Sequence, residues 1–163
     1  MKVKEYNRKK AIEYAVKWAY KRNPKYYNFD TVGGDCTSFV SQCVYAGSGI
    51  MNYKKHIGWY YNSQSDRTAS WSGVEYLYNF LTKNKGIGPR AKVSKIEEVQ
   101  IGDIIQLKFS QDRFSHSLII VDKKGNDLEN IYIATHTEDA NYRKVSTYEF
   151  EDIRFLRITN IGI

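Results

Sequence analysis

Cys36 is the residue whose type and position best suit covalent chemistry. It follows Gly33-Gly34-Asp35 and begins a segment in which apolar residues recur at helical spacing: Phe39, Val40, Cys43 and Val44. This pattern predicts a glycine turn that leads into a helix, with Cys36 in the first turn. The free N–H groups and the positive dipole end at a helix N-terminus favour a thiolate over a thiol. We therefore expect Cys36 to be a nucleophile with a lowered pKa.

The alternative for Cys36 is an ordinary buried position, because a free cysteine often packs as a small hydrophobic residue. Cys43 lies deeper in the same predicted helix, and we expect it to be structural. We expect no disulfide between the two, because seven helical residues separate their Cα atoms by about 10 Å and bridging needs about 7 Å or less.

His116 and His136 stand at the ends of two apolar segments, residues 117–121 and 131–135. If these segments are strands joined through Gly125-Asn126, they are antiparallel and place both histidines at the same end. A cysteine, a histidine on the facing sheet and a polar residue on the next strand form a nucleophile, a base and an orienting group. A lone histidine at a strand end is more often structural. Zinc is the competing use, but these residues lack the paired spacing of structural zinc sites, so we expect no metal or cofactor.

The elements that must position these residues are helices first and strands afterwards. Asn7 is predicted to cap a helix that runs to about Arg22, with an inner stripe of Ala11, Ile12, Ala15, Val16 and Ala19. The cysteine helix should end near residues 47–49, and capping-box spacing at residues 72–75 predicts a third helix through Leu81. Strands are expected at 101–109, 115–121, 130–135 and 150–158. This order predicts an α+β fold, with N-terminal helices packed on an antiparallel sheet, in a single domain over residues 1–163.

The charge of the chain suggests an anionic partner. Its net charge is +7 and its sequence pI is about 9.3, which fits an acidic cell-envelope polymer, a membrane surface or nucleic acid. A lysine-rich solvated surface is the plain alternative. The basic residues are scattered without an arginine stripe, so we expect no nucleic acid partner. The first residues lack the apolar core of a signal peptide, and no transmembrane segment is expected.

Aromatic residues indicate where a substrate would bind. The chain has 14 Tyr and 3 Trp, which combine flat apolar contact with a hydrogen bond and suit a cleft for peptides or sugars. Residues 26–30 form an aromatic approach to the glycine turn. A long polar and aromatic segment that ends near Ser70 is the predicted binding rim.

Several motifs together resemble the bacterial putative amidase domain family, which is papain-like and similar to the CHAP and NlpC-type cell-wall hydrolases. The resemblance covers most of the chain. It rests on residues 11–20, 34–43, 59–61, 70–71, 102–106, 116–117 and 136–139. In this order and spacing the short motifs are fairly specific.

The resemblance implies a mechanism and a set of site residues. Cys36 would be the nucleophile, His116 the general base and His136 the third member, with Asp139 as the rival for that place. The N–H of Cys36 would help to hold the oxyanion. We expect substrate contacts from five residues: Asp35, Tyr27, Trp59, Tyr60 and Trp71. The family implies hydrolysis of an amide in peptidoglycan or a related peptide through a thioester, and it suggests an extracellular or cell-wall location.

Two alternatives to this enzyme stay open. One is a catalytically inactive wall-binding module of the same fold, which the positive charge and the aromatic content would serve. The other is a papain-like enzyme that attacks a different amide, such as a protein side chain or a small molecule.

Overall fold

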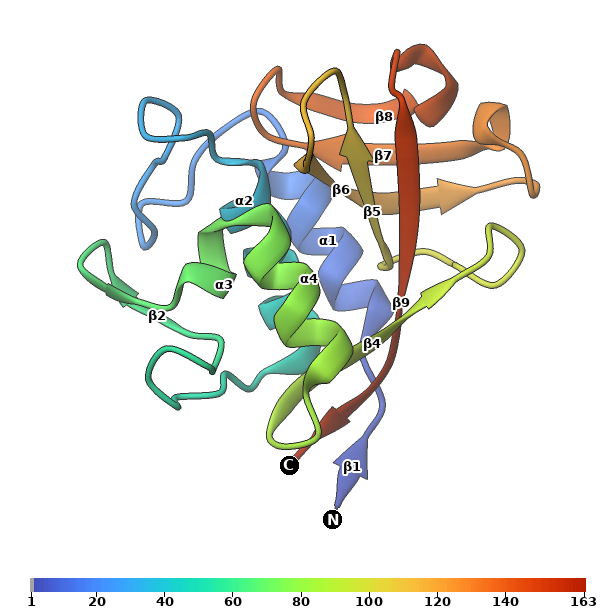
Figure 1. Ribbon diagram of the computed structural model, residues 1–163. Helices are drawn as coiled ribbons and strands as arrows, with labels where there is room; N and C mark the ends of the chain where they lie inside the picture. The colour runs from blue at the N-terminus through green and yellow to red at the C-terminus, as the bar shows by residue number, and fades with distance from the viewer. Residues whose placement is uncertain (1) are drawn as a thin grey trace.

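The computed structural model describes residues 2–163 as helices packed on one face of an antiparallel sheet (Figure 1). The strand order is β1-β9-β5-β6-β7-β8, and β4 also pairs with β9. All the strand pairs are antiparallel. The predicted α+β class, with an antiparallel sheet, is therefore confirmed.

The bounds of the elements follow the chain in a simple order. The helices are α1 (Arg8–Trp18), α2 (Cys36–Ser48), α3 (Ala69–Ser72) and α4 (Val74–Lys83). The strands of the large sheet are β1 (Val3–Lys4), β4 (Gly88–Ser94), β5 (Ile104–Lys108), β6 (Phe114–Lys123), β7 (Ile131–Thr135), β8 (Ala140–Lys144) and β9 (Asp152–Gly162). A small hairpin joins β2 (Tyr61–Ser63) to β3 (Asp66–Arg67), and short 3-10 turns are η1 (Leu128–Asn130) and η2 (Val145–Thr147).

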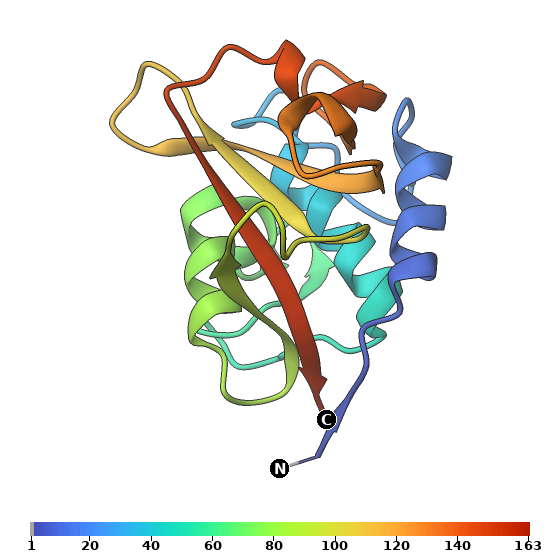
Figure 2. The same cartoon turned by 90° about the vertical axis from the view of Figure 1, so that its right-hand side faces the viewer.

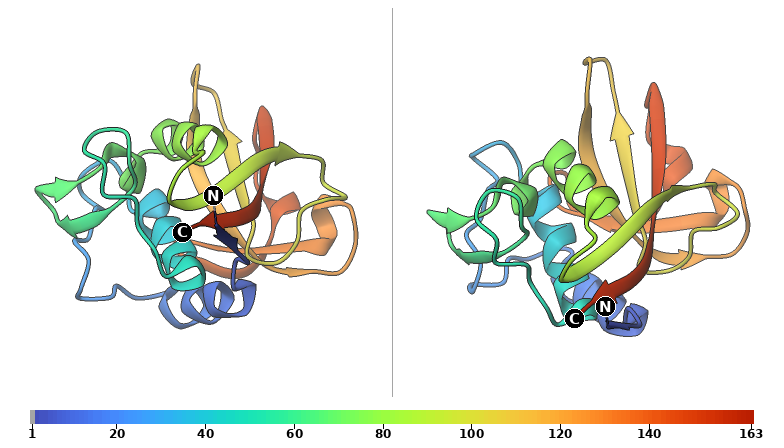
Figure 3. Two further views of the ribbon diagram at one scale, coloured as in Figure 1. Left: turned by 90° about the horizontal axis from the view of Figure 1, so that it is seen from below. Right: turned by 60° about the horizontal axis from the view of Figure 1, so that its bottom comes forward.

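The sheet separates two hydrophobic cores. Side chains alternate along β6, so Ile119 and Val121 face the helices while Leu118 and Ile120 face the other side. Figures 2 and 3 show the helices gathered on one side of the sheet, with residues from the β7–β9 region over the other. Helix α2 is the most deeply placed, because eleven of its thirteen residues are buried. The side chains at the start of α2 are therefore packed on both sides.

Helix α1 is shorter than the sequence predicts. Asn7 caps it as expected, since its side chain accepts a hydrogen bond from the N–H of Lys10, but the helix ends at Trp18 rather than near Arg22. The stripe of α1 that faces the core is also narrower than the sequence predicts. Val16 is 42% exposed, whereas Ala11, Ala15 and Ala19 are fully buried. Three small residues at i, i+4 and i+8 let α1 lie close to α2, so the stripe needs no larger side chain.

The region between α2 and β5 differs most from expectation. The predicted capping box at residues 72–75 does not form, because Gly73 holds the N-cap position of α4 and no side chain caps the helix. Strand β4 was not predicted; it begins at Gly88, which adopts a φ of +101°. The edge strands β1 and β8 were not predicted, because they are short and mostly exposed, so their sequences lack a clear apolar alternation.

A buried ion pair ties α1 to the sheet. Asp103 is fully buried, and its Oδ1 atom lies 2.7 Å from Nη1 of Arg8 and accepts the N–H of Ile158. Arg8 also donates to the carbonyl oxygen of Ile158, at 2.9 Å. Burial raises the pKa of Asp103, and the charge of Arg8 opposes that shift. The ion pair therefore holds the N-terminal end of α1 against the sheet.

We expect Arg8→Ala to lower the free energy of unfolding by about 3–5 kcal/mol at neutral pH, because it leaves a buried carboxylate without its partner. The loss should shrink at acidic pH, since protonation of Asp103 removes the buried charge. Urea denaturation at several pH values measures both effects. Lys9→Ala is the matched control, because Lys9 is exposed and pairs only weakly with Glu13, at 4.0 Å; it should change stability by less than about 0.5 kcal/mol. Equal losses in the two variants would contradict the assignment.

Candidate active site

Cys36 is the first residue of α2, as the sequence predicts. The turn before it uses left-handed backbone at Gly33 and Gly34, with φ of +83° and +96°, a conformation that glycine adopts at little cost. A side chain at Gly34 would also meet Oγ1 of Thr137 at 3.1 Å. The two glycines are therefore needed to bring the start of the helix onto the end of β7.

The Cys36 thiol is buried but surrounded by hydrogen-bond donors. Its residue is 6% exposed. The backbone N–H groups of Ser117 and Thr37 and the Thr37 hydroxyl approach the sulfur. These contacts favour the thiolate, but burial outweighs them and raises the pKa of Cys36. The expected lowering of this pKa is therefore wrong in the free protein, because desolvation exceeds the effect of the helix N-terminus.

His116 lies at the start of β6, next to the residue that contacts Cys36. Its ring packs near Phe109 and Tyr148, with centroid distances of 6.3 and 5.9 Å. Burial, helped by the charge of Arg143, lowers the pKa of His116 to about 4. The imidazole is therefore neutral at physiological pH and can accept a proton. No hydrogen bond joins it to Cys36 in the described part of the chain, and its nearest polar contact is Oγ1 of Thr135, at 3.5 Å.

Tyr148 and Arg143 belong to the same cluster and were missed in the sequence. The Tyr148 hydroxyl oxygen is buried without a geometrically acceptable hydrogen-bond partner within residues 2–163, and the residue is close enough to Cys36 for their charges to interact. Burial raises its pKa, so the hydroxyl keeps its hydrogen. The Arg143 guanidinium stacks over the ring, 3.6 Å from its centroid. No spacing in the sequence marks these two residues, because Arg143 lies in the edge strand β8 and Tyr148 in the connection between β8 and β9.

His136 makes a different set of contacts from those predicted. Its Nδ1 lies 2.6 Å from Oδ2 of Asp35, its Nε2 lies 2.7 Å from the carbonyl oxygen of Trp18, and its ring stacks on Phe39. A carbonyl oxygen only accepts, so Nε2 carries a hydrogen. Asp35 also accepts the N–H of Phe29, at 2.9 Å. Both ring nitrogens of His136 are therefore engaged in short hydrogen bonds, one with Asp35 and one with the Trp18 carbonyl oxygen.

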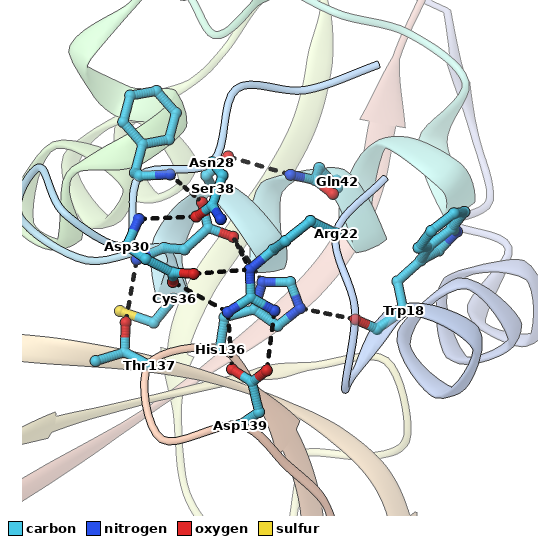
Figure 4. Close-up of polar contacts among 12 residues, drawn as sticks. Trp18, Arg22, Asn28, Asp30, Cys36, Ser38, Gln42, His136, Thr137 and Asp139 are labelled. Carbon is cyan, nitrogen blue, oxygen red and sulfur yellow. Dashed lines mark hydrogen bonds and ion pairs between the residues drawn. The ribbon is translucent and has the colours of Figure 1, made fainter. Parts of the chain in front are cut away.

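Arg22 completes this network and engages Asp139. Arg22 makes two hydrogen bonds of 2.9 Å to the Asp139 carboxylate and two to Asp30 (Figure 4). Its Nε also lies 3.6 Å from Oδ2 of Asp35. Figure 4 shows the Cys36 sulfur pointing away from the His136 ring. Neither His136 nor Asp139 contacts His116, so the structure does not bring together the predicted third member and the predicted base.

The predicted substrate-binding residues are mostly part of the core. Trp59 and Trp71 are fully buried, with ring centroids 4.9 Å apart, and Asp35 is committed to His136. A substrate cannot reach these three side chains in this structure. Tyr27 is half-buried and borders an open hollow beside residues 61–64. Tyr60 is 7% exposed and borders a separate hollow with Asp66 and Thr68.

A hollow of about 700 Å³ is lined by Phe109 and Tyr148, the two rings that pack near His116. Glu149 and Glu151 also line it, whereas Cys36 and His116 do not. Within residues 2–163, no three His, Cys, Asp or Glu side chains are grouped in a way that could hold a metal ion. No helix in the same range is long and apolar enough to cross a membrane.

Comparisons with known proteins identify related chains. Residues 5–158 match the family described as "Putative amidase domain". The uncharacterized protein YhbB of Bacillus subtilis is 37% identical over 126 residues, which cover 75% of this chain and 39% of that protein. The uncharacterized protein YjcM of the same organism is 28% identical over 145 residues, or 83% of this chain and 32% of that protein. The chain thus spans between a third and two-fifths of these relatives. No solved structure matches it.

The contacts of the two histidines predict different roles in stability. His136→Ala should lower the free energy of unfolding by about 3–5 kcal/mol, because it leaves Asp35 buried without its partner. His116→Ala removes ring packing but no strong hydrogen bond, and should cost less than about 2 kcal/mol. Chemical denaturation of both variants measures the difference. A larger loss for His116→Ala would show that the two roles are reversed.

Burial also sets the reactivity of the thiol in the free protein. We expect iodoacetamide to modify Cys36 slowly at pH 7, with a midpoint above the ordinary thiol pKa of about 8.5, because the neutral thiol persists. The rate should be followed by mass spectrometry from pH 6 to 11 in a Cys43→Ala background. Fast modification with a midpoint well below 8.5 would instead reveal a preformed thiolate.

Proposed function

The chain belongs to the putative amidase domain family, and on that premise we propose that it hydrolyses an amide bond with Cys36 as the nucleophile. An amidase domain indicates a hydrolase that acts on a carbon–nitrogen amide bond. The cysteine mechanism, the site residues and the substrate are parts of the proposal. We also propose that the fold is papain-like, because a cysteine at a helix start packs against an antiparallel sheet that carries a histidine.

The observation that carries the proposal is the contact between the start of α2 and the start of β6. The N–H of Ser117 approaches the Cys36 sulfur, and the hydroxyls of Thr37 and Ser117 lie 2.9 Å apart. The thiol is therefore held beside the residue that follows His116. Three donors around a buried sulfur have no evident use for a neutral thiol, but they would stabilise a thiolate once it forms.

The reaction proceeds in two halves. Neutral His116 removes the thiol proton as the sulfur attacks the carbonyl carbon, and the resulting imidazolium donates that proton to the departing amine as the carbon–nitrogen bond breaks. His116 then takes a proton from water, which attacks the thioester and releases the carboxylic acid and the free thiol. The raised pKa of Cys36 and the lowered pKa of His116 both keep the resting pair neutral. The proton therefore moves from the thiol to His116 during the attack.

The oxyanion of the intermediates requires hydrogen-bond donors. The N–H of Cys36 lies in the first turn of α2, where no helical acceptor exists. The Tyr148 hydroxyl is buried, and its raised pKa keeps it protonated. We assign these two groups to the oxyanion. His136 and Asp139 serve in the proposal as positioning residues, because they hold Asp35 and Arg22 at the start of α2.

Peptidoglycan or a related cell-wall peptide is the proposed substrate class. The hollow that Phe109 and Tyr148 line combines their apolar surfaces with carboxylates at Glu149 and Glu151. An amino group on a peptide side chain would be attracted to these carboxylates, while the peptide bond would lie toward Cys36. This arrangement suits a peptide that carries a free amine.

A wall-binding module without catalysis is the second candidate. It is favoured by one observation, the raised pKa of a buried Cys36 that makes no hydrogen bond to His116 among the described contacts. This candidate predicts an unreactive thiol in the presence as well as the absence of wall peptides.

Turnover of purified peptidoglycan fragments, followed by liquid chromatography and mass spectrometry, separates the two candidates. Cys36→Ala should abolish hydrolysis, and His116→Ala should slow it by about 10²–10⁴-fold. Tyr148→Phe should lower kcat by about 10²-fold, since it removes one oxyanion donor. Cys43→Ala is the matched control and should stay active, because Cys43 lies in the core away from the site. An active Cys36→Ala protein would refute the mechanism, whereas a parent that binds wall fragments without cleaving them would favour the binding module.

A further inference from the structure

A second cavity, of about 630 Å³, lies beyond the C-terminal end of α2. It is bounded by the loop 52–58 on one side and by the end of α4 with the turn 83–86 on the other. We call it the basic groove. The thirteen residues of α2 rise by about 1.5 Å each, so the groove lies roughly 20 Å from Cys36. It shares no residue with the candidate active site.

The groove carries positive charge without counter-ions. Lys54, Lys83 and Lys85 line it together with His56, and no Asp or Glu is among its lining residues. None of these lysines forms an ion pair in the part of the chain that the structure describes. By contrast, Arg8, Arg22 and Arg154 are all paired with carboxylates. Charges of one sign around a cavity focus the field inside it, so an anion that enters would relieve their mutual repulsion.

The remaining lining groups suit a ligand that is rich in hydroxyls. The Tyr76 ring is 62% exposed and borders the cavity, and Phe80 lies buried behind it. An exposed aromatic ring offers a stacking surface for a sugar or polyol chain. The Asn79 amide also lines the groove, is exposed and has no side-chain hydrogen bond among the described residues, so it is free to bind a hydroxyl group.

Both walls of the groove are held rigidly. The Asn84 side chain donates to the carbonyl oxygens of Ile87 and Pro89, each at 3.0 Å. In the opposite wall, the N–H of Gly58 donates to the carbonyl oxygen of Lys54 at 2.8 Å. A Cβ at Gly58 would lie 2.2 Å from the Asn52 carbonyl oxygen, so the turn requires glycine. A preformed cavity lowers the entropic cost of binding.

We propose that the basic groove binds a linear, hydroxyl-rich polyanion, either a polyol phosphate or an acidic glycan. Lysines supply the charge, Tyr76 supplies the stacking surface and Asn79 supplies the amide. A nucleic acid is less suited, because no arginine lines the groove and only one exposed aromatic ring is present to stack a base. The binding site does not depend on the proposed amide hydrolysis.

Fluorescence anisotropy with labelled poly(glycerol phosphate) and labelled polygalacturonate tests the proposal and separates its two ligand sources. We compare the K54A/K83A/K85A variant with the control K10A/K92A/K95A, which removes three exposed lysines from other elements. The groove variant should bind at least one of the polymers about tenfold more weakly, with a shallower dependence on salt, because fewer counterions are displaced. The control should bind within about twofold of the parent if the polymer is bound by the lysines of the groove and not by the net charge of the protein. Circular dichroism checks that both variants are folded.

A second pair of variants tests the aromatic contact. Tyr76→Ala should weaken binding by about threefold to tenfold, and Tyr76→Phe should restore it, because stacking requires the ring and not the hydroxyl. Tyr20→Ala is the control, since Tyr20 is 65% exposed on a different element. Unchanged binding in Tyr76→Ala would overturn the stacking contact.

Three outcomes would overturn the proposal that the groove binds a hydroxyl-rich polyanion. They are equal losses in the groove and control lysine variants, equal binding of neutral dextran, and equally tight binding of a single-stranded DNA of matched charge. Cys36→Ala separates this proposal from the catalytic one, because it should bind the polyanion as the parent does. The groove variant should likewise keep the parent's rate of Cys36 alkylation.

Discussion

The candidate active site depends on the neutralisation of one buried carboxylate at the start of α2. Asp35 occupies the N-cap position but does not cap the helix; its side chain pairs with His136 and accepts the Phe29 N–H. A buried charge is tolerated only when it is paired and hydrogen-bonded. The pairing therefore fixes the end of β7, the loop 22–30 and the start of α2 relative to one another. Cys36 is the next residue along the chain, so its position follows from this ion pair.

The same ion pair decides which histidine is free for chemistry. Both nitrogens of His136 are occupied, by Asp35 and by the Trp18 carbonyl oxygen, and the Cys36 sulfur points away from its ring (Figure 4). His116 has no comparable partner, and its neutral ring stands at the start of the strand that contacts the sulfur. Neither nitrogen of His136 is therefore available to take the thiol proton, whereas no strong hydrogen bond holds the ring of His116. Charge and hydrogen bonding thus favour His116 as the base.

The sequence predicts the parts of the fold that depend on apolar periodicity. The start of α2 at Cys36, the cap at Asn7 and the antiparallel pairing of β6 with β7 all follow from such patterns. The burial of Trp59 and Trp71 could not be predicted, because an aromatic residue in a polar segment fits a rim as well as a core. Likewise, spacing places His116 and His136 at the same end of the sheet but not the direction of each ring. For His136 that direction is set by Asp35 and Trp18, which lie about a hundred residues away in the chain.

The charged residues differ between the two ends of α2, and this difference separates binding from chemistry. Near the start of α2, Asp30, Asp35 and Asp139 surround Arg22, and Glu138 lies near Tyr148. Beyond its end, the lysines of the basic groove have no carboxylate beside them. A polyanion would therefore be attracted to the groove rather than to the thiol. An anionic polymer held in the groove would keep any attached peptide on the same protein molecule as Cys36. Such tethering raises the local concentration of substrate without any new contact at the reacting atoms. The two sites then favour a substrate in which the anionic polymer and the scissile amide belong to the same material.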